Sequence, residues 1–448
     1  GTGVHIYRAG TAFVSFGSVV SSGGPDNTGI RSEEGNLQNL GDITIYNGTG
    51  IESTGSYTIN AGTINNKGPE SKGISSYSSR IDNTGKIAGD GTGIDMKDNS
   101  ILLNDGVIEA FGTGTGVISS GSFILNSKGG IISSEYNSGI SAFDSSVENY
   151  GIIKSMDSSG IISNFSSVIN KELINSVNGT GIESSNSYVL NEGTVISGNK
   201  GIYADNNRTG GIASDADIDL STGTIDVKNS ENAVGVYVNK GTIVDSGSRI
   251  TVGKNSVALY AKDSDVSLNG IIIDLNGDNA LGIFLDGTSS LATTGTNIIN
   301  IDGRDIILFN MNSSGAVSNN FTVGSIAPGS TYTLGNITGG VFKYTGNSEL
   351  ASNGTLVTGK ESAVYLDGST VTSAAGSVNV AAIALNDQYS GLLPLPAGMT
   401  AGIDGENNGT IILGDGSAGI YGKNGSRISN KGAITVGSSS AGLMTSGS

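Results

Sequence analysis

The chain has 448 residues, including 72 Gly, 5 Pro, one His and no Cys or Trp. The absence of cysteine excludes disulfide frameworks and cysteine-ligated metal centres. Gly and Pro together stay below the roughly 25–30 % at which disorder becomes the default expectation. The formal net charge of −17 is spread along the chain, which disfavours nucleic acid and anionic membrane surfaces as partners, because both bind clusters of Lys and Arg.

Apolar residues occur mostly singly, between Ser, Gly, Asn and Thr. This pattern disfavours a helix bundle, because helices need apolar residues at a spacing of three to four. No apolar run approaches the roughly 20 residues of a membrane-spanning helix, so we expect no membrane insertion by this segment. Residues 1–6 lack the basic start and apolar centre of a signal peptide, so we expect an internal or mature piece of a longer protein.

Two markers recur in phase every 20 to 23 residues along the first half of the chain. The first is a glycine followed by Ile or Val. Its glycines are Gly29, Gly50, Gly73, Gly93, Gly116, Gly139, Gly160, Gly181 and Gly201. The second marker is the pattern apolar-x-Asn-x-Gly-x-Ile or one close to it, and its asparagines are Asn60, Asn83, Asn104, Asn126, Asn149, Asn170 and Asn191. Because such self-similarity is the signature of repeat architectures, it decides the fold prediction.

Within one unit, residues 50–64, apolar and polar residues alternate over three to five positions, and Gly or Asn stands between these runs. This period of two predicts short strands joined by tight turns. One such turn cannot bury its own apolar side chains, but a second turn stacked about 4.8 Å above it can pair with every strand. The sequence therefore predicts an all-β fold, a single-stranded right-handed parallel β-helix (β-solenoid) of about 20 coils with loop insertions.

Each repeated residue type has an expected structural role. Five apolar residues should point inward and stack: Ile59, Ile81, Leu103, Leu125 and Val147. The marker glycines should occupy turns that need a positive φ or a close approach between coils. The marker asparagines should stack as an amide ladder, in which each side chain hydrogen-bonds to its neighbours above and below.

The regularity of the repeat divides the chain into three stretches of one continuous solenoid. Regular coils are expected over residues 1–202, irregular coils with protruding loops over 203–400, and regular coils again over 401–448. The interruption at 203–212 predicts a loop insertion in one coil, and a proline segment at 392–397 falls in a second irregular region.

Known catalytic and metal-binding patterns are largely missing from the sequence. His5 is the single histidine, which leaves no partner for Ser-His pairs or multi-histidine metal sites. The acidic run 214–220 lacks the glycine and the distal Glu that a calcium loop needs, and the glycine-rich stretches 89–95 and 112–116 read as solenoid turns. We therefore predict no cofactor, no metal site and no enzymatic activity.

The unit that begins at 179–182 and continues through 188–195 resembles the passenger coils of large bacterial autotransporters, especially the giant fusobacterial outer-membrane adhesins. The resemblance covers residues 29–202 best. It implies a monomeric passenger on the bacterial cell surface, anchored through an outer-membrane β-barrel outside this segment. It also implies attachment to a host-cell surface receptor, either a glycan or a protein, or to a partner bacterium.

The favoured function is thus a cell-surface adhesin, a rod that presents loops for binding. We place the candidate partner contacts in the irregular region, on exposed rings that stack on sugars or fill partner pockets. These candidates are Phe309, Tyr332, Phe342, Tyr344 and Tyr389, with the loops at 203–212 and 386–400 beside them. Packing of these rings inside the solenoid is the competing interpretation.

Two further functions remain open at this stage. One is a carbohydrate-active β-helix enzyme, such as a polysaccharide lyase or hydrolase or a tailspike-like protein, which needs a groove holding two acids at the separation used by glycosidases. The other is a purely structural stalk. The Gly-His-Gly and Arg-Ile-Lys segments of pectin-type hydrolases do not occur in this sequence.

Overall fold

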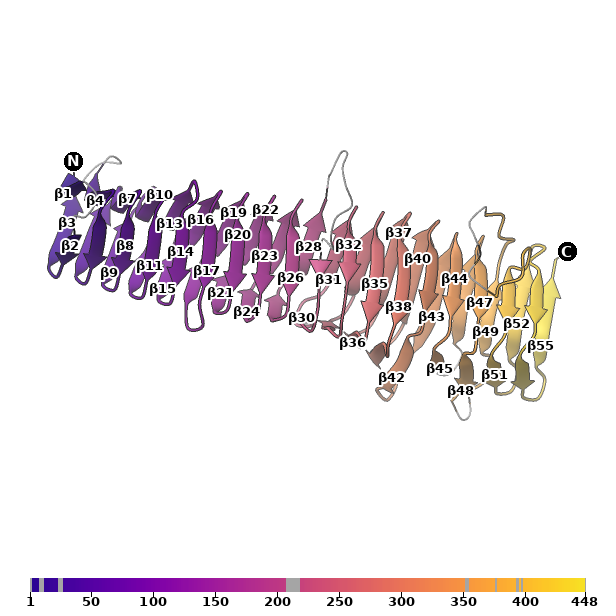
Figure 1. Cartoon of the computed structure of the whole chain (residues 1–448). Coiled ribbons are helices and arrows are strands. Elements are labelled where there is room, and N and C mark those ends of the chain that lie inside the picture. Colours follow the sequence, from indigo (N-terminus) through magenta and orange to yellow (C-terminus); the bar gives the residue numbers. More distant parts are fainter. Residues whose placement is uncertain are drawn as a thin grey trace. The chain divides into compact units, whose positions relative to one another are not determined.

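The computed structural model describes residues 2–7, 12–22, 27–206, 218–350, 354–374, 377–391, 395 and 398–447 (Figure 1). The chain divides into two compact units, Gly1–Asp205 and Asn206–Ser448. The described residues contain no helix, and the described strands pair in parallel, each with the equivalent strand of the next coil. The predicted all-β parallel solenoid is confirmed, and its described residues form about 18 turns where about 20 were predicted.

In the first unit, each coil contributes strands to three faces. The first face contains β1 (Thr2–Tyr7), β4 (Thr28–Glu33), β7 (Thr49–Thr54), β10 (Lys72–Tyr77), β13 (Thr92–Lys97), β16 (Val117–Ser120), β19 (Ile140–Phe143), β22 (Ile161–Asn164), β25 (Ile182–Ser185) and β28 (Lys200–Asp205). The second face contains β2 (Ala12–Ser15), β5 (Asn36–Asn39), β8 (Tyr57–Asn60), β11 (Arg80–Asn83), β14 (Ile101–Asn104), β17 (Phe123–Asn126), β20 (Ser146–Asn149), β23 (Ser167–Asn170) and β26 (Tyr188–Asn191). The third face contains β3 (Ser18–Ser22), β6 (Asp42–Tyr46), β9 (Thr63–Lys67), β12 (Lys86–Gly89), β15 (Val107–Ala110), β18 (Ile131–Ser134), β21 (Ile152–Ser155), β24 (Leu173–Ser176) and β27 (Thr194–Ser197).

The second unit repeats this plan with longer and less equal strands. Its first face contains β31 (Val234–Asn239), β34 (Val257–Lys262), β37 (Leu281–Gly287), β40 (Ile306–Ser313), β43 (Tyr332–Thr338), β46 (Thr355–Lys360), β49 (Ala381–Leu385), β52 (Ala418–Lys423) and β55 (Ala441–Ser446). Its second face contains β29 (Ile218–Asp219), β32 (Thr242–Val244), β35 (Asp265–Asn269), β38 (Ser290–Thr294), β41 (Ala316–Asn319), β44 (Val341–Tyr344), β47 (Ala363–Leu366), β50 (Gly405–Asn407) and β53 (Ile428–Asn430). Its third face is split into one sheet of β30 (Thr224–Val227), β33 (Arg249–Val252), β36 (Ile272–Asn276), β39 (Ile298–Asp302) and β42 (Thr322–Ile326) and another of β45 (Asn347–Leu350), β48 (Thr370–Ser373), β51 (Thr410–Leu413) and β54 (Ala433–Val436).

The interior of the first unit is filled by columns of branched apolar residues. Ile30, Ile51 and Ile74 stand in register on adjacent strands and are fully buried. The same column continues through Ile94, Val117, Ile140, Ile161 and Ile182. Burying one such side chain contributes about 1.5–3 kcal/mol. Each isoleucine is covered by the coils on either side, so the core exists only in the stack.

Three of the five residues predicted to point inward in fact point outward. Ile81 and Val147 are fully buried as expected, but Ile59, Leu103 and Leu125 are only half-buried because they face outward. Their places inside are taken by the residues one position earlier: Thr58, Leu102 and Ile124. Each of these outward residues directly precedes a marker asparagine. Since neighbours on a strand point to opposite faces, an inward asparagine forces the preceding residue outward.

The predicted amide ladder is confirmed. The Nδ2 atom of Asn60 donates to Oδ1 of Asn83 at 2.8 Å, and Asn83 donates in the same way to Asn104. Equal bonds of 2.8 Å extend the ladder from Asn39 to Asn191, and Asn407 donates to Asn430 in the second unit. The amides of Asn39 to Asn191 are fully buried, so these bonds offset a desolvation cost of about 1–3 kcal/mol for each amide.

The marker glycines confirm one predicted role and contradict the other. A Cβ built on Gly29 would lie 2.7 Å from the carbonyl oxygen of Gly50, and one on Gly50 would lie 2.5 Å from the oxygen of Gly73. Close approach between coils therefore excludes a side chain. The expectation of a positive φ is wrong for these residues, because they lie within or beside the first-face strands with an ordinary backbone.

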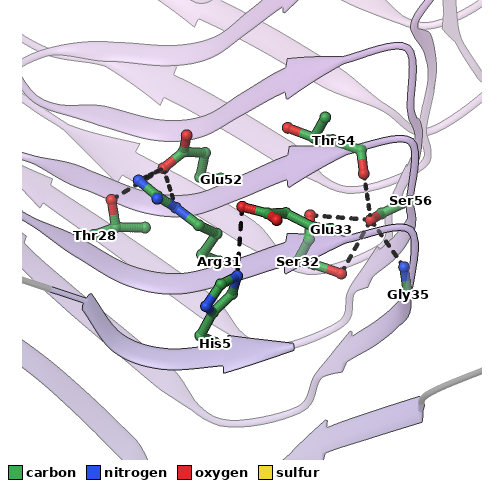
Figure 2. Close-up of polar contacts among 9 residues, drawn as sticks. All are labelled: His5, Thr28, Arg31, Ser32, Glu33, Gly35, Glu52, Thr54 and Ser56. Atoms are coloured by element: carbon green, nitrogen blue, oxygen red, sulfur yellow. Dashed lines mark hydrogen bonds and ion pairs between the residues drawn. The ribbon is translucent and has the colours of Figure 1, made fainter. Parts of the chain in front are cut away.

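A column of hydrogen-bonded serines lies at the corner between the first and second faces. The amide of Ser56 donates to Oγ of Ser79 at 3.0 Å, and the same bond links successive coils through Ser100, Ser122, Ser145, Ser166 and Ser187. Figure 2 shows Ser56 with its other partners, Ser32, Gly35 and Thr54. The residue before each of these serines has a positive φ, and its left-handed backbone turns the chain through the corner.

Several expectations lie wholly or partly outside the described residues. These are residues 207–212 of the predicted insertion, Ser214, Asp215 and Asp217 of the acidic run, and residues 392–394 and 396–397 of the proline segment.

Candidate functional site

Four of the five predicted contact rings lie inside the second unit. Phe309 and Phe342 are buried with their ring centroids 5.7 Å apart in an edge-to-face contact. Tyr332 and Tyr344 are also buried, and Tyr344 donates its hydroxyl hydrogen to the carbonyl of Phe321 at 2.8 Å. Burial raises the pKa of both phenols. These four rings therefore fill the interior of the second unit, as the competing interpretation expected, and are not exposed for contact with a partner.

Tyr389 is the fifth predicted ring, and it is half-buried. Its amide donates to Oδ1 of Asp404 at 2.8 Å. Together with Thr338 and Glu361 it lines a cavity of 380 Å³ beside the C-terminal ends of β40 and β43. Tyr389 therefore differs from the other four candidates, because it is only half-buried and lines a surface cavity.

The first face of the first unit begins with a charged ladder, drawn in Figure 2. His5 lies with Nε2 3.4 Å from Oε1 of Glu33 and is about half exposed. The guanidinium of Arg31 donates to Oε2 of Glu52 through Nε at 2.9 Å and Nη2 at 2.7 Å. These outward pairs join neighbouring coils, and partly exposed pairs of this kind contribute about 0–1 kcal/mol each.

Further along the same unit, the first face and its corners become apolar. Seven large apolar side chains are each more than one third exposed, and we call them the first-face patch: Phe111, Ile118, Tyr136, Phe143, Met156, Phe165 and Val177. Backbone bonds place Phe111, Glu135, Met156 and Val177 at equivalent positions of four successive corners, so an acid stands between Phe111 and the other two apolar residues. The strands β16, β19 and β22, which carry or directly precede members of the patch, lie side by side on the first face (Figure 1).

The aromatic members of the patch are held in defined positions. Phe143 and Phe165 pack edge-to-face with centroids 5.9 Å apart, although they are 50 % and 57 % exposed. Phe165 has a φ of 50°, a conformation that is unfavourable for a bulky residue. The corner turn enforces this conformation, because the equivalent residues of the other coils, such as Asp144 and Asn186, also have a positive φ.

The charged residues within the segments that carry the patch have one sign. The segments 111–121, 135–145, 156–166 and 177–187, which carry the patch, contain four acidic residues and no Lys or Arg. The acids are Glu135, Asp144, Asp157 and Glu183. The negative charge of Glu135 raises the pKa of the neighbouring Tyr136 phenol. The four patch segments therefore combine exposed rings with a formal charge of −4, and the exposed Lys154 lies just outside them.

A second group of rings lies on the first face of the second unit. Tyr237, Tyr260 and Phe284 occupy the same outward position on β31, β34 and β37. Their centroids are 5.1 Å and 4.6 Å apart, and each ring is half-buried. These mutual contacts leave them less accessible than the rings of the first-face patch.

A groove lies on the third face of the second unit and encloses 460 Å³. Arg249, Thr251 and Asp274 lie on its β33 and β36 side, and Asn300 and Ser325 lie on its β39 and β42 side. Within the described part of the chain, no cluster of three or more His, Asp or Glu residues is arranged to hold a metal ion. The same residues form no helix with the length and apolar character needed to cross a membrane.

The sequence interpretation missed both the first-face patch and the groove. The patch residues occur at intervals that look irregular in the sequence, because they alternate between strand ends and corner turns. The alternation of inward and outward residues can be counted from each marker asparagine, and this count identifies the outward residues of the second face. The count fails for the first face, because the corner between the two faces interrupts the alternation. The groove residues carry no motif, and their meeting depends on the stacking of β33, β36, β39 and β42.

Comparisons with known proteins returned no match: no family model, no curated protein and no solved structure is similar to this chain.

Proposed function

We propose that this chain is a segment of a bacterial cell-surface adhesin and that the first-face patch holds the partner. The observation that carries the proposal is the combination of seven exposed apolar side chains with four acids and no base within the four segments 111–121, 135–145, 156–166 and 177–187 of adjacent coils. Exposed apolar residues gathered in this way are typical of interaction surfaces. Secretion as an autotransporter passenger and location at the cell surface belong to the same proposal, on the resemblance of the coils.

The chemistry of the patch defines the partner. Carboxylates such as Glu135 and Asp157 attract Lys and Arg, and ring faces such as Tyr136 bind cationic groups at about 0.5–2 kcal/mol each. A second copy of this chain would bring the same negative charge and be repelled. The patch therefore fits a protein surface with an apolar centre and a basic rim, on a host cell or another bacterium.

Attachment of the whole chain to cells tests this proposal. Beads coated with the chain should adhere to cultured epithelial cells or to intact bacteria. Phe111→Ser combined with Met156→Ser and Val177→Ser should reduce the number of bound beads by about tenfold, because hot-spot side chains dominate interface energy. Tyr7→Ser and Phe16→Ser, which are exposed outside the patch, serve as the matched control and should adhere normally.

The charge of the patch provides a second readout. Glu135→Gln with Asp157→Asn should weaken adhesion at low salt and flatten its salt dependence, because exposed charges act over a screening length of about 10 Å at 0.1 M salt. Adhesion that is equal for patch and control variants would refute the patch as the binding surface and favour the stalk. A chain that adheres to no cell type would refute the adhesin proposal itself.

A further inference from the structure

The floor of the third-face groove is a sheltered polar network. Asp274 faces outward from β36 but is only 5 % exposed. Its Oδ2 atom accepts hydrogen bonds from Nε of Arg249 at 2.5 Å and from Oγ1 of Thr251 at 3.2 Å. Its Oδ1 atom accepts from Nδ2 of Asn300 at 2.8 Å. Both carboxylate oxygens are thus engaged, and the carboxylate is fixed in place.

One wall of the groove is formed by an irregularity in β42. The register moves from Ile299 opposite Val323 to Ile301 opposite Ile326, so β42 contains one extra residue at this point. The extra loop of backbone brings Ser325 over Asn300, whose Oδ1 accepts from both the amide and the hydroxyl of Ser325 at 3.0 Å. Such bulges re-aim side chains and are common beside binding sites.

The groove keeps a set of donors and acceptors for a ligand. Arg249 is held through Nε and its side chain is half exposed, which leaves the terminal guanidinium nitrogens as donors. Asn276 and Asp302 face each other in register on β36 and β39, and both are exposed at the groove rim. Ile326 adds an apolar edge. The enclosed 460 Å³ lies within the roughly 300–1,000 Å³ of small-ligand sites.

The balance of charge selects the class of ligand. Arg249 and Lys228 oppose Asp274 and Asp302 among the lining residues, so neither an anion nor a cation finds an uncompensated field. The lining residues include no aromatic ring on which a nucleobase would stack. A sugar presents neighbouring hydroxyls that both donate and accept, and it also presents an apolar edge of C–H groups.

We propose that this groove binds a neutral saccharide segment without cleaving it. Arg249, Asn276 and Asp302 contact its hydroxyls, and Ile326 contacts its apolar edge. Asp274 acts as a positioning residue, because it holds Arg249 and both of its carboxylate oxygens are occupied. This site is separate from the first-face patch, so the proposal stands or falls independently of the adhesion experiment.

Saturation-transfer NMR on the whole chain tests the proposal with defined probes. The probes are the neutral hexasaccharides of cellulose, starch, xylan and chitin. At least one should receive magnetisation from the protein, and Asn276→Ala and Asp302→Ala should weaken its affinity by about tenfold each, as expected for the loss of a hydrogen bond in a polar site. Arg304→Ala is the control, because Arg304 forms an exposed ion pair with Asp278 on the same unit outside the groove.

Asp274→Asn adds a readout specific to positioning. This variant should lower affinity for the probe by a factor similar to that of Arg249→Ala, with no further loss in the double variant. If this substitution of a buried residue unfolds the chain, Asn276→Ala and Asp302→Ala at the exposed rim still decide whether the groove binds the probe. No transfer to any of the four hexasaccharides, or unchanged affinity in Asn276→Ala and Asp302→Ala, would overturn the proposal. Release of shorter sugars would overturn the assignment of Asp274 to positioning.

Discussion

The amide ladder of the first unit shows what a single residue does in this fold. Each inner asparagine of the ladder both donates to one neighbour and accepts from the other. A change to any one of them therefore leaves two buried polar atoms unsatisfied, one in the coil below and one in the coil above. The cost of such a change exceeds the value of one hydrogen bond.

The central residue Asn104 provides the test. Asn104→Leu removes the acceptor for Nδ2 of Asn83 and the donor to Oδ1 of Asn126, so we expect the free energy of unfolding to fall by about 3 kcal/mol. Urea unfolding followed by circular dichroism measures this change. Asp105→Asn, an exposed change at the next position, is the control and should be neutral. A loss no larger than that of the control would mean that the ladder does not stabilise the fold.

The backbone conformation of Phe165 destabilises the fold, whereas the contact of its ring stabilises it. Its φ of 50° costs roughly 1–2 kcal/mol relative to an ordinary backbone. Its edge-to-face contact with Phe143 offsets part of this cost. In a chain that already carries Phe143→Ser, we expect Phe165→Asn to raise the free energy of unfolding by about 1 kcal/mol, because Asn tolerates this conformation better. The double-mutant cycle isolates the ring pair. No gain in the Phe143→Ser background would show that the backbone at Phe165 is not strained.

At the scale of elements, the strands of the first face approach closely because their glycines stack. The glycines in neighbouring coils leave room only for hydrogen, since each would bring a Cβ against the carbonyl oxygen of the coil that follows. The corner serines act in the same direction, because each hydroxyl accepts a backbone hydrogen bond from the preceding coil. Both features set the spacing between coils without contributing to a binding surface.

Gly50→Ala tests the role of the glycine column. The new Cβ would lie 2.5 Å from the oxygen of Gly73 and 2.8 Å from Cγ2 of Ile64, so the strands must move apart. We expect a fall of at least about 2 kcal/mol in the free energy of unfolding. Gly17→Ala is the matched control, because a Cβ there has no heavy atom within 4 Å. Equal thermal unfolding of the two variants would contradict the steric argument.

At the scale of the whole molecule, the dominant quantity is the negative charge. The net charge of −17 at pH 7 keeps copies of the chain apart, because like-charged surfaces repel. It also adds to the local acidity of the first-face patch, so an approaching basic partner is attracted by the molecule as a whole and by the patch. The same charge makes association between copies dependent on pH.

The pH dependence of self-association follows from this charge. As the pH falls toward the isoelectric point near 4.4, the carboxylates become protonated and the repulsion between molecules disappears. We expect light scattering to rise reversibly in that range and to stay flat near pH 7. A neutral variant of the patch, Glu135→Gln with Asp157→Asn, should shift the onset only slightly, because it removes two of 40 acidic residues. Scattering that does not change with pH would contradict this account.

The fold was largely predictable from the sequence, whereas the candidate sites were not. The two markers specify a strand period, a coil length and an amide ladder, because each of these depends on contacts between equivalent residues of adjacent coils. The three misplaced residues, Ile59, Leu103 and Leu125, show the limit of this reasoning. The alternation with a period of two is visible in the sequence. Which of the two alternating sets of residues points inward depends on the position of the adjacent asparagine.

The sequence by itself determined that this chain stacks as a parallel solenoid, because the repeat can bury its isoleucines in no other local way. Only the tertiary structure decided which rings are exposed and which polar residues meet. Phe309 and Phe143 are both rings beside strands in the sequence, yet one fills the interior of a wide coil and the other lies on the surface. The groove likewise depends on the register shift in β42, because a surface formed by several coils depends on their relative stacking, which no single repeat encodes.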